Sequence, residues 1–277
     1  MQFREWALAL VPALAAIIVA LTCSAQTTPA PVEATRVVHV FVALCDNKNQ
    51  GIVPVPVALG NGQDPKSNLY WGAQFGADTF FRRSEHWRPL AATGELKPPL
   101  LARSVFESKG GGAKVIVVMD AYDGADMKQA LTDFLRSAAG TASGAIDVTD
   151  GPKRELIAAW GSSHLVAFVG HNGLMDVRLD AFPEHQAAAP QPKAAVVLAC
   201  KSNAFFREPL RKANCAPLVT TAQLMAPEAY TLDAVIRSWA AGDSPATTRE
   251  RAAAAYAKYQ KISLPAARGV FVAGWGE

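Results

Sequence analysis

The chain has 277 residues, of which half are hydrophobic and 18% are charged. This composition excludes a disordered protein, a collagen-like fibre and a membrane protein with many spans. Lysine and arginine total 27 against 24 acidic residues, a net charge of +3. Because a nucleic-acid-binding protein concentrates its basic residues on one face or stripe, this small and scattered excess predicts no nucleic-acid partner.

The N-terminus has the pattern of an export signal. Arg4 precedes an apolar run at residues 7–21, and small residues follow up to Ala25. This pattern predicts a signal peptide at residues 1–25, cleavage after Ala25 and a periplasmic or secreted protein. Two alternatives remain, namely a lipid anchor on Cys23 and an uncleaved membrane anchor, although about 18 residues is the lower limit for a span. After cleavage we expect no stable membrane span.

A linker and a single domain follow the predicted signal. Residues 26–35 are mostly polar with two prolines, which is typical of a tether. Residues 36–277 contain no internal repeat and predict one α/β domain. Three cysteines remain after cleavage, Cys45, Cys200 and Cys215. Their odd number means that at least one thiol is free or bonded to another molecule.

Short apolar strands alternate with helices along this domain. Such alternation predicts a three-layer α/β/α sandwich with a mostly parallel sheet. A stretch at residues 52–68 interrupts the series, because its prolines exclude a regular helix or central strand and its length is typical of a functional loop. In chain order, the pattern predicts a strand at 36–44, a helix at 69–84, a hairpin of 100–108 with 113–119, a helix from Asp123 or Asp126, a helix at 154–160, strands at 164–169 and 194–198, a helix at 205–213, a strand at 217–221, helices at 228–241 and 248–261, and a strand at 269–273.

Several common catalytic and cofactor motifs are absent from the sequence. There is no Gly-x-Ser-x-Gly elbow, no dinucleotide fingerprint and no phosphate-binding Walker loop. Neither a Cys-x-x-Cys nor a His-x-x-x-His pair supports a zinc site. We therefore expect no metal and no cofactor. His39, inside the first predicted strand, is expected to be a hydrogen-bonded core residue.

Two predicted strands run into residues that can perform chemistry. His171 follows the strand at 164–169, and Cys200 follows the strand at 194–198. Because the carboxyl ends of parallel strands meet at one edge of a sheet, we expect the two side chains to lie near each other. A base or cation beside a cysteine favours the nucleophilic thiolate. The alternatives are that Cys200 is a small buried core residue or forms a disulfide with Cys45.

This arrangement resembles the caspase-like cysteine peptidases of clan CD. Their signature is an apolar block, His-Gly, a spacer, and a second apolar block ending in Ala-Cys, which residues 166–202 follow most specifically. The resemblance implies a caspase-like sheet, His171 as general base, Cys200 as nucleophile and Gly173 as an oxyanion-turn residue. It implies peptide-bond hydrolysis through an acyl-enzyme without a bound cofactor.

The sequence departs from this family at two positions near the predicted pair. Asn172 is inserted between His171 and Gly173, and Leu198 stands two residues before Cys200, where several relatives carry an acidic residue at the specificity pocket. Asp46 is a candidate to supply acidic character for a basic substrate side chain instead.

The sequence thus predicts an exported cysteine endopeptidase with a peptide or protein substrate. Relatives with this fold include members that have lost activity, so the alternative is a catalytically inactive caspase-like module that binds a peptide or partner in its crevice or at residues 52–68. A third hypothesis is acyl or peptidyl transfer by the same His171–Cys200 pair.

Overall fold

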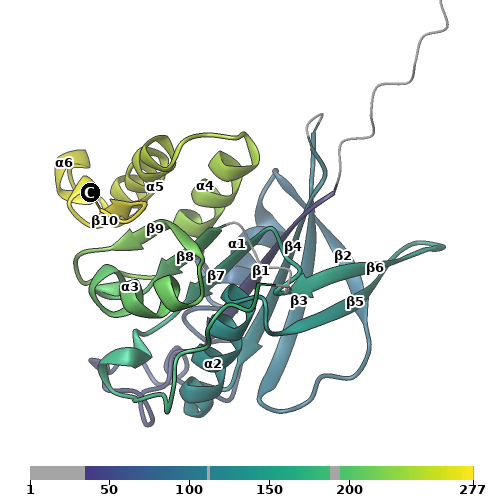
Figure 1. The fold of residues 1–277 in the computed structure, drawn as a ribbon, viewed down its shortest axis with the longest axis horizontal. Coiled ribbons are helices and arrows are strands. Elements are labelled where there is room, and N and C mark those ends of the chain that lie inside the picture. Colours follow the sequence, from purple (N-terminus) through teal and green to yellow (C-terminus); the bar gives the residue numbers. More distant parts are fainter. Residues whose placement is uncertain (1–34, 111–112, 188–193, 277) are drawn as a thin grey trace, which may run out of the picture. The chain divides into compact units, whose positions relative to one another are not determined.

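The computed structural model describes residues 35–276, apart from residues 111–112 and 188–193. The predicted signal peptide, its cleavage after Ala25 and nearly all of the predicted linker lie outside the described residues. Within the described part, helices and strands build an α/β fold around one ten-stranded sheet (Figure 1). No helix in this part is both long and apolar enough to cross a membrane.

The elements follow each other in mixed order along the described chain. The strands are β1 (Arg36–Ala43), β2 (Trp87–Thr93), β3 (Leu100–Ser108), β4 (Val115–Tyr122), β5 (Ser143–Asp150), β6 (Lys153–Trp160), β7 (Leu165–Val169), β8 (Ala194–Leu198), β9 (Ala216–Thr221) and β10 (Phe271–Ala273). The helices are α1 (Ala77–Arg83), α2 (Met127–Ala138), α3 (Ser202–Lys212), α4 (Ala229–Ala240), α5 (Pro245–Gln260) and α6 (Leu264–Arg268), with short 3-10 helices η1 (Gly124–Asp126) and η2 (Gly173–Met175).

The sheet is mixed, so the prediction of a mostly parallel sheet was wrong. Its strand order is β10-β9-β8-β7-β1-β4-β3-β2-β5-β6. Strands β9, β8, β7, β1 and β4 run parallel in four pairings. The other five pairings are antiparallel. The antiparallel part contains β2, β5 and β6, which the sequence pattern did not predict.

The segment at 154–160 is a strand rather than the predicted helix. It forms β6, which pairs along its whole length with β5 in an antiparallel hairpin. Ile157 and Ala159 are buried, whereas Leu156 and Ala158 between them are exposed, which is the alternation of a strand. The buried pair packs on residues of β1 and β4. Pairing and packing therefore override the helix propensity of its Glu, Leu and Ala residues.

Most other predicted elements are confirmed within a few residues, and residues 52–68 contain neither helix nor strand. The helix predicted at 69–84 is confirmed only for Ala77–Arg83. Gly72 and Gly76 explain the difference, because their backbone touches other backbone atoms. A Cβ on Gly72 would lie 2.0 Å from the Lys66 carbonyl oxygen, and one on Gly76 would lie 2.4 Å from the Trp71 carbonyl carbon. The chain before α1 is accordingly a series of turns.

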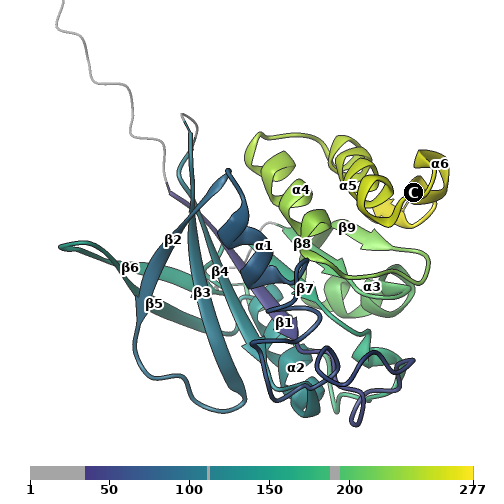
Figure 2. The same cartoon turned by 180° about the vertical axis from the view of Figure 1, so that it is seen from behind.

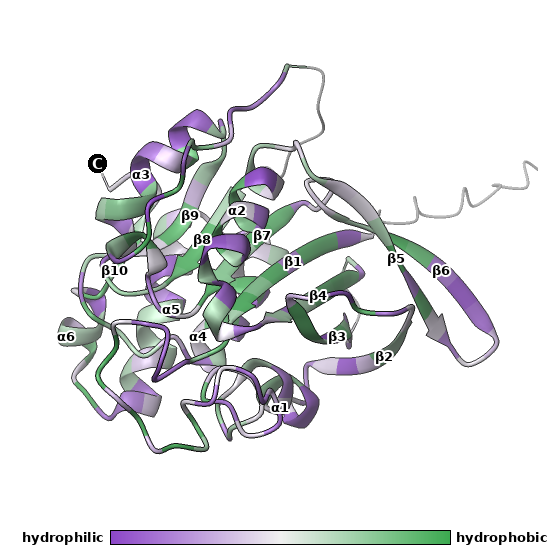
Figure 3. Ribbon diagram, turned by 90° about the horizontal axis from the view of Figure 1, so that it is seen from below, coloured by the Kyte–Doolittle hydropathy of each residue, from purple (hydrophilic) through white to green (hydrophobic). Residues whose placement is uncertain are grey.

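Helices cover both faces of the parallel part of the sheet (Figures 1 and 2). On one face α1, α4 and α5 contribute side chains such as Phe81, Val235 and Tyr256 to a common core with the sheet. On the other face α2 and α3 contribute Phe134 and Phe206. The central strands between them are strongly hydrophobic (Figure 3), as strands covered on both faces must be.

A buried charged network lies within this sheet. His39 of β1 is hydrogen-bonded as expected: its Nδ1 accepts from the Trp160 amide at 2.9 Å, and its Nε2 donates to Asp120 Oδ2 at 3.1 Å. Arg103 of β3 donates to both Asp120 oxygens at 2.6 and 2.7 Å. Burial alone would raise the pKa of Asp120, but the hydrogen bonds from Arg103 and His39 hold the pKa below its usual range. The network ties β1, β3, β4 and β6 together.

Asp120→Asn is expected to lower the free energy of unfolding by about 3–5 kcal/mol at neutral pH, because it breaks a buried ion pair. Since the carboxyl titrates near 3.9 when unfolded and lower when folded, its contribution is present above about pH 3.9 and is lost as pH falls through the folded-state pKa. Urea unfolding across this pH range measures both effects. Asp180→Asn, which removes an exposed partner of Lys128, is the control; equal losses in the two variants would contradict the prediction.

Candidate active site

The parallel pairing of β7 with β8 brings the two predicted catalytic residues to the same edge of the sheet. In the register of this pair Val169 lies opposite Leu198. His171 and Cys200 follow two residues further along each chain. Asn172 Nδ2 donates a 2.6 Å hydrogen bond to the Cys200 carbonyl oxygen and connects the two turns. The structure therefore places His171 and Cys200 on adjoining turns beyond neighbouring strands.

The Cys200 thiol is half-buried and lies against the backbone of the segment between β9 and α4. The Met225 amide donates to Cys200 Sγ at 3.4 Å, and the Cys200 thiol donates to the Met225 carbonyl oxygen at 3.6 Å. An amide that donates to sulfur stabilises the thiolate. Burial raises the pKa of Tyr70 and Tyr256. Negative charge raises both pKa values further, first from Cys45 for Tyr70 and from Glu228 for Tyr256, and then from Cys200 for both. Two tyrosine hydroxyls thus lie within electrostatic reach of this sulfur.

The His171 imidazole has a carboxylate partner that the sequence analysis missed. Its Nε2 forms a short contact with Asp176 Oδ2, while only 10% of the His171 side chain is exposed. The 3-10 helix η2 makes this possible, because the Asp176 amide donates to the Gly173 carbonyl oxygen and turns the chain back. The Asn172-Gly173 dipeptide, a turn signal, was the available clue. A carboxylate here holds the ring in one orientation.

Gly173 is engaged in packing and in its own turn. Its amide donates to the His171 carbonyl oxygen at 2.9 Å. A Cβ at this position would lie 2.3 Å from Met127 Cγ, so a larger residue would require the Met127 side chain at the start of α2 to move. The amide that the family resemblance assigns to an oxyanion therefore already has an acceptor. Asn172 Oδ1 is buried without a hydrogen-bond partner among the described residues.

Asp46 is a buried structural residue in this structure. Its carboxylate accepts four hydrogen bonds, from the amides of Lys48 and Asn49 and from the side chains of Asn49 and Gln63. Burial opposes ionisation, but these hydrogen bonds hold the pKa of Asp46 below its ordinary value. With 1% exposure it has no room for a substrate side chain. The structure therefore does not place Asp46 in a substrate pocket.

Leu198, the second predicted pocket residue, is also part of the core. It is fully buried in β8 and packs in the same cluster as Val196 and Val169. An acidic residue at this position would place an uncompensated charge in an apolar interior. The hydrophobic identity of Leu198 is explained by packing.

The other cysteines differ from Cys200 in burial. Cys45 and Cys215 are fully buried, and burial raises their pKa values to about 11 and about 12. Cys45 and Cys200 are free thiols, so the structure does not contain the disulfide considered as an alternative. Among the described residues, no group of three or more His, Cys, Asp or Glu side chains is placed to hold a metal ion.

Comparison of the chain with models of known protein families, with curated proteins and with solved structures gave no match.

Asp46→Ala is expected to speed hydrogen exchange of the Lys48 and Asn49 amides, because the carboxylate is the acceptor for both. Mass-spectrometric exchange over residues 46–63 measures the effect. Lys48→Ala, which removes an exposed side chain from the same turn, is the matched control. If the two variants exchange alike, Asp46 does not organise this loop.

Proposed function

We propose that this chain is a cysteine endopeptidase with a caspase-like α/β/α sandwich fold. The single observation that carries the proposal is the pairing of β7 with β8, which sets His171 and Cys200 on adjoining turns, joined by the Asn172 hydrogen bond to Cys200. The helices on both faces of the parallel strands support the fold assignment. The pair was inferred from sequence, and its two residues follow neighbouring strands at the same edge of the sheet.

In the proposed reaction Cys200 Sγ attacks the carbonyl carbon of a peptide bond. The thiol proton passes to His171, which then donates it to the leaving amine as the carbon–nitrogen bond breaks. Water, with its proton taken by His171, hydrolyses the resulting thioester and releases the thiol. Asp176 keeps the imidazole oriented and stabilises its positive charge during these steps. The Met225 amide stabilises negative charge on the sulfur.

A polypeptide substrate fits the surface around this edge. Exposed large hydrophobic side chains stand on three loops that leave its strands: Val53 and Val57 after β1, Met175 after β7 and Leu224 after β9. Leu224 directly precedes Met225, and Met175 directly precedes Asp176. Exposed apolar groups on loops at the same sheet edge as a candidate nucleophile are typical of surfaces that bind polypeptide side chains.

One observation favours a second candidate function. The Gly173 amide is bound to the His171 carbonyl oxygen, so it cannot stabilise an oxyanion unless the turn changes. A caspase-like module that binds a peptide at the same edge without hydrolysing it needs no such change.

Export is part of the proposal. Removal of residues 1–25 would place Cys200 in the periplasm or outside the cell, where a peptidase must keep its thiol reduced to remain active.

Alkylation of Cys200 by iodoacetamide tests the proposed pair. A thiol activated by His171 is expected to react fast at neutral pH, and His171→Ala should slow that reaction because it removes the proposed base. Peptide mapping by mass spectrometry follows each cysteine separately. Cys45 and Cys215 are internal controls, since burial raises their pKa values to about 11 and about 12. Slow labelling of Cys200 that His171→Ala leaves unchanged would contradict the catalytic pair and leave the binding module.

Asp176→Asn tests whether the Asp176 carboxylate acts on His171 or only packs against it. Loss of the carboxylate partner of His171 is expected to slow alkylation of Cys200 severalfold at neutral pH, because the imidazole is no longer held in one orientation. Asp180→Asn, an exposed carboxylate on the same loop, should leave the rate unchanged. A pH–rate profile that is identical in both variants and the parent would remove Asp176 from the proposed mechanism.

A further inference from the structure

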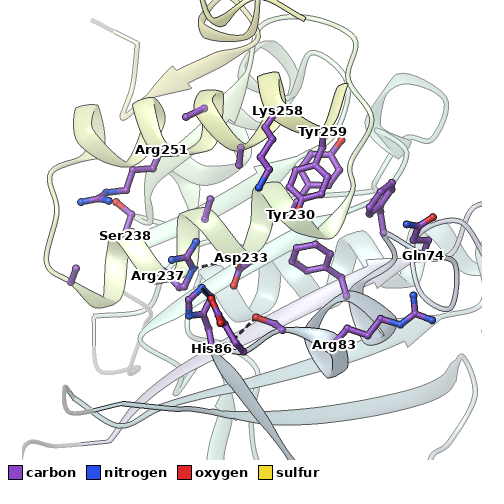
Figure 4. Close-up of a pocket in the computed structure, with 18 residues that line it drawn as sticks. Gln74, Arg83, His86, Tyr230, Asp233, Arg237, Ser238, Arg251, Lys258 and Tyr259 are labelled. Carbon is purple, nitrogen blue, oxygen red and sulfur yellow. Dashed lines mark hydrogen bonds and ion pairs between the residues drawn. The ribbon is translucent and has the colours of Figure 1, made fainter. Parts of the chain in front are cut away.

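A groove separate from the candidate active site lies along the outer side of α4 (Figure 4). Its volume of about 950 Å³ is in the range of ligand sites, about 300–1,000 Å³. The floor is a stripe of α4 at helical spacing, Tyr230, Ala234 and Ser238, followed by Ala241 at its C-cap. The walls are the end of α1 and one side of α5. His171 and Cys200 are not among its lining residues.

The long side chains along this groove carry more positive than negative charge. Arg83, Arg237, Arg251 and Lys258 line it. Arg237 is paired with Asp233, and Arg251 with Asp243. Arg83 and Lys258 are exposed, and no ion pair is recorded for either within the described part of the chain. They come from opposite walls, α1 and α5 (Figure 4).

The groove's two carboxylates do not balance these cations. Asp233 is buried and already accepts a 2.7 Å hydrogen bond from Trp87 Nε1 in addition to its pairing with Arg237. The Glu85 side chain is 88% exposed and has only a distant histidine partner. Among the described lining residues, Arg83 and Lys258 are therefore two cations outside any ion pair, against one exposed carboxylate, Glu85.

One end of the groove is aromatic. Tyr230 and Tyr259 stack with their ring centroids 4.3 Å apart, and Phe75 and Phe80 pack edge-on against them. Phe75, Phe80 and Tyr259 are only partly buried, so ring surface remains accessible. Lys258 lies beside Tyr259, 5.4 Å from its ring centroid. Apolar surface and an unpaired cation thus adjoin at this end.

From this combination we propose that the groove binds an acidic polypeptide segment that carries an aromatic or large apolar side chain. Acidic side chains pair with Arg83 and Lys258, and the apolar side chain packs on Phe75, Phe80 and Tyr259. A nucleic acid fits less well, because its row of phosphates requires a row of unpaired cations and would approach Asp233 and Glu85. The proposal is independent of catalysis at Cys200.

Fluorescence anisotropy with defined peptides tests the inference. The probe is a short fluorescein-labelled peptide of glutamate, serine and phenylalanine, compared with versions in which glutamine or lysine replaces glutamate. The purified full chain is expected to bind the acidic probe most tightly and to lose affinity as salt is raised. Arg83→Glu or Lys258→Glu should weaken binding about fivefold, since each reverses one exposed charge.

Lys97→Glu is the matched control, because Lys97 is an exposed cation in the loop before β3, outside the groove. Equal weakening by Lys97→Glu would overturn the proposal, because net charge would then explain the binding. Equal affinity for the glutamate and glutamine probes would overturn it as well. Stronger competition by a single-stranded oligonucleotide than by unlabelled acidic peptide would identify a nucleic-acid surface instead. Cys200→Ala should leave all affinities unchanged, which separates this test from the peptidase proposal.

Discussion

The parallel pairing of β7 with β8 is the constraint on which the candidate site depends. Two neighbouring parallel strands deliver their next residues to one edge, and here those residues are His171 and Cys200. Every other group in the site is placed relative to these two turns: Asn172 joins them, Asp176 returns to the imidazole and Met225 meets the sulfur. The central position of β1 fixes the same edge for Asp46 and the loop after it.

The sequence predicted an element well where its hydrophobic pattern follows directly from its burial in the fold. Strands β1, β7 and β8 are covered on both faces and are therefore continuous apolar runs in the sequence, which predicted their positions within a residue or two and with them the turns that carry His171 and Cys200. The hairpin of β5 and β6 has one exposed face and mixed composition, and its alternation is confined to a few residues such as Ile157 and Ala159. Its strand character depends on pairing partners that a single sequence does not reveal.

For the individual site residues, the sequence predicted positions in the chain but not the roles that depend on neighbours in space. Asp46 and Leu198 follow or end apolar strands, as catalytic residues do, but their neighbours determine their roles: hydrogen-bond donors saturate one and hydrophobic side chains surround the other. Asp176 was missed because its approach to His171 requires the tight turn of η2, which no spacing rule specifies. The groove along α4 could not be predicted from the sequence either, because its lining combines residues of α1, α4 and α5 that are far apart in the chain.

The start of α3 has an electrostatic consequence for the thiol. Lys201 adopts a left-handed backbone conformation, and α3 begins at Ser202, two residues after Cys200. The aligned peptide dipoles of a helix give its N-terminus a partial positive charge of about half an elementary unit. Cys200 is therefore covalently attached to the electropositive pole of an eleven-residue helix. This partial charge does not titrate, so it is present beside Cys200 at every pH, whereas the charge of an ionisable side chain depends on its protonation.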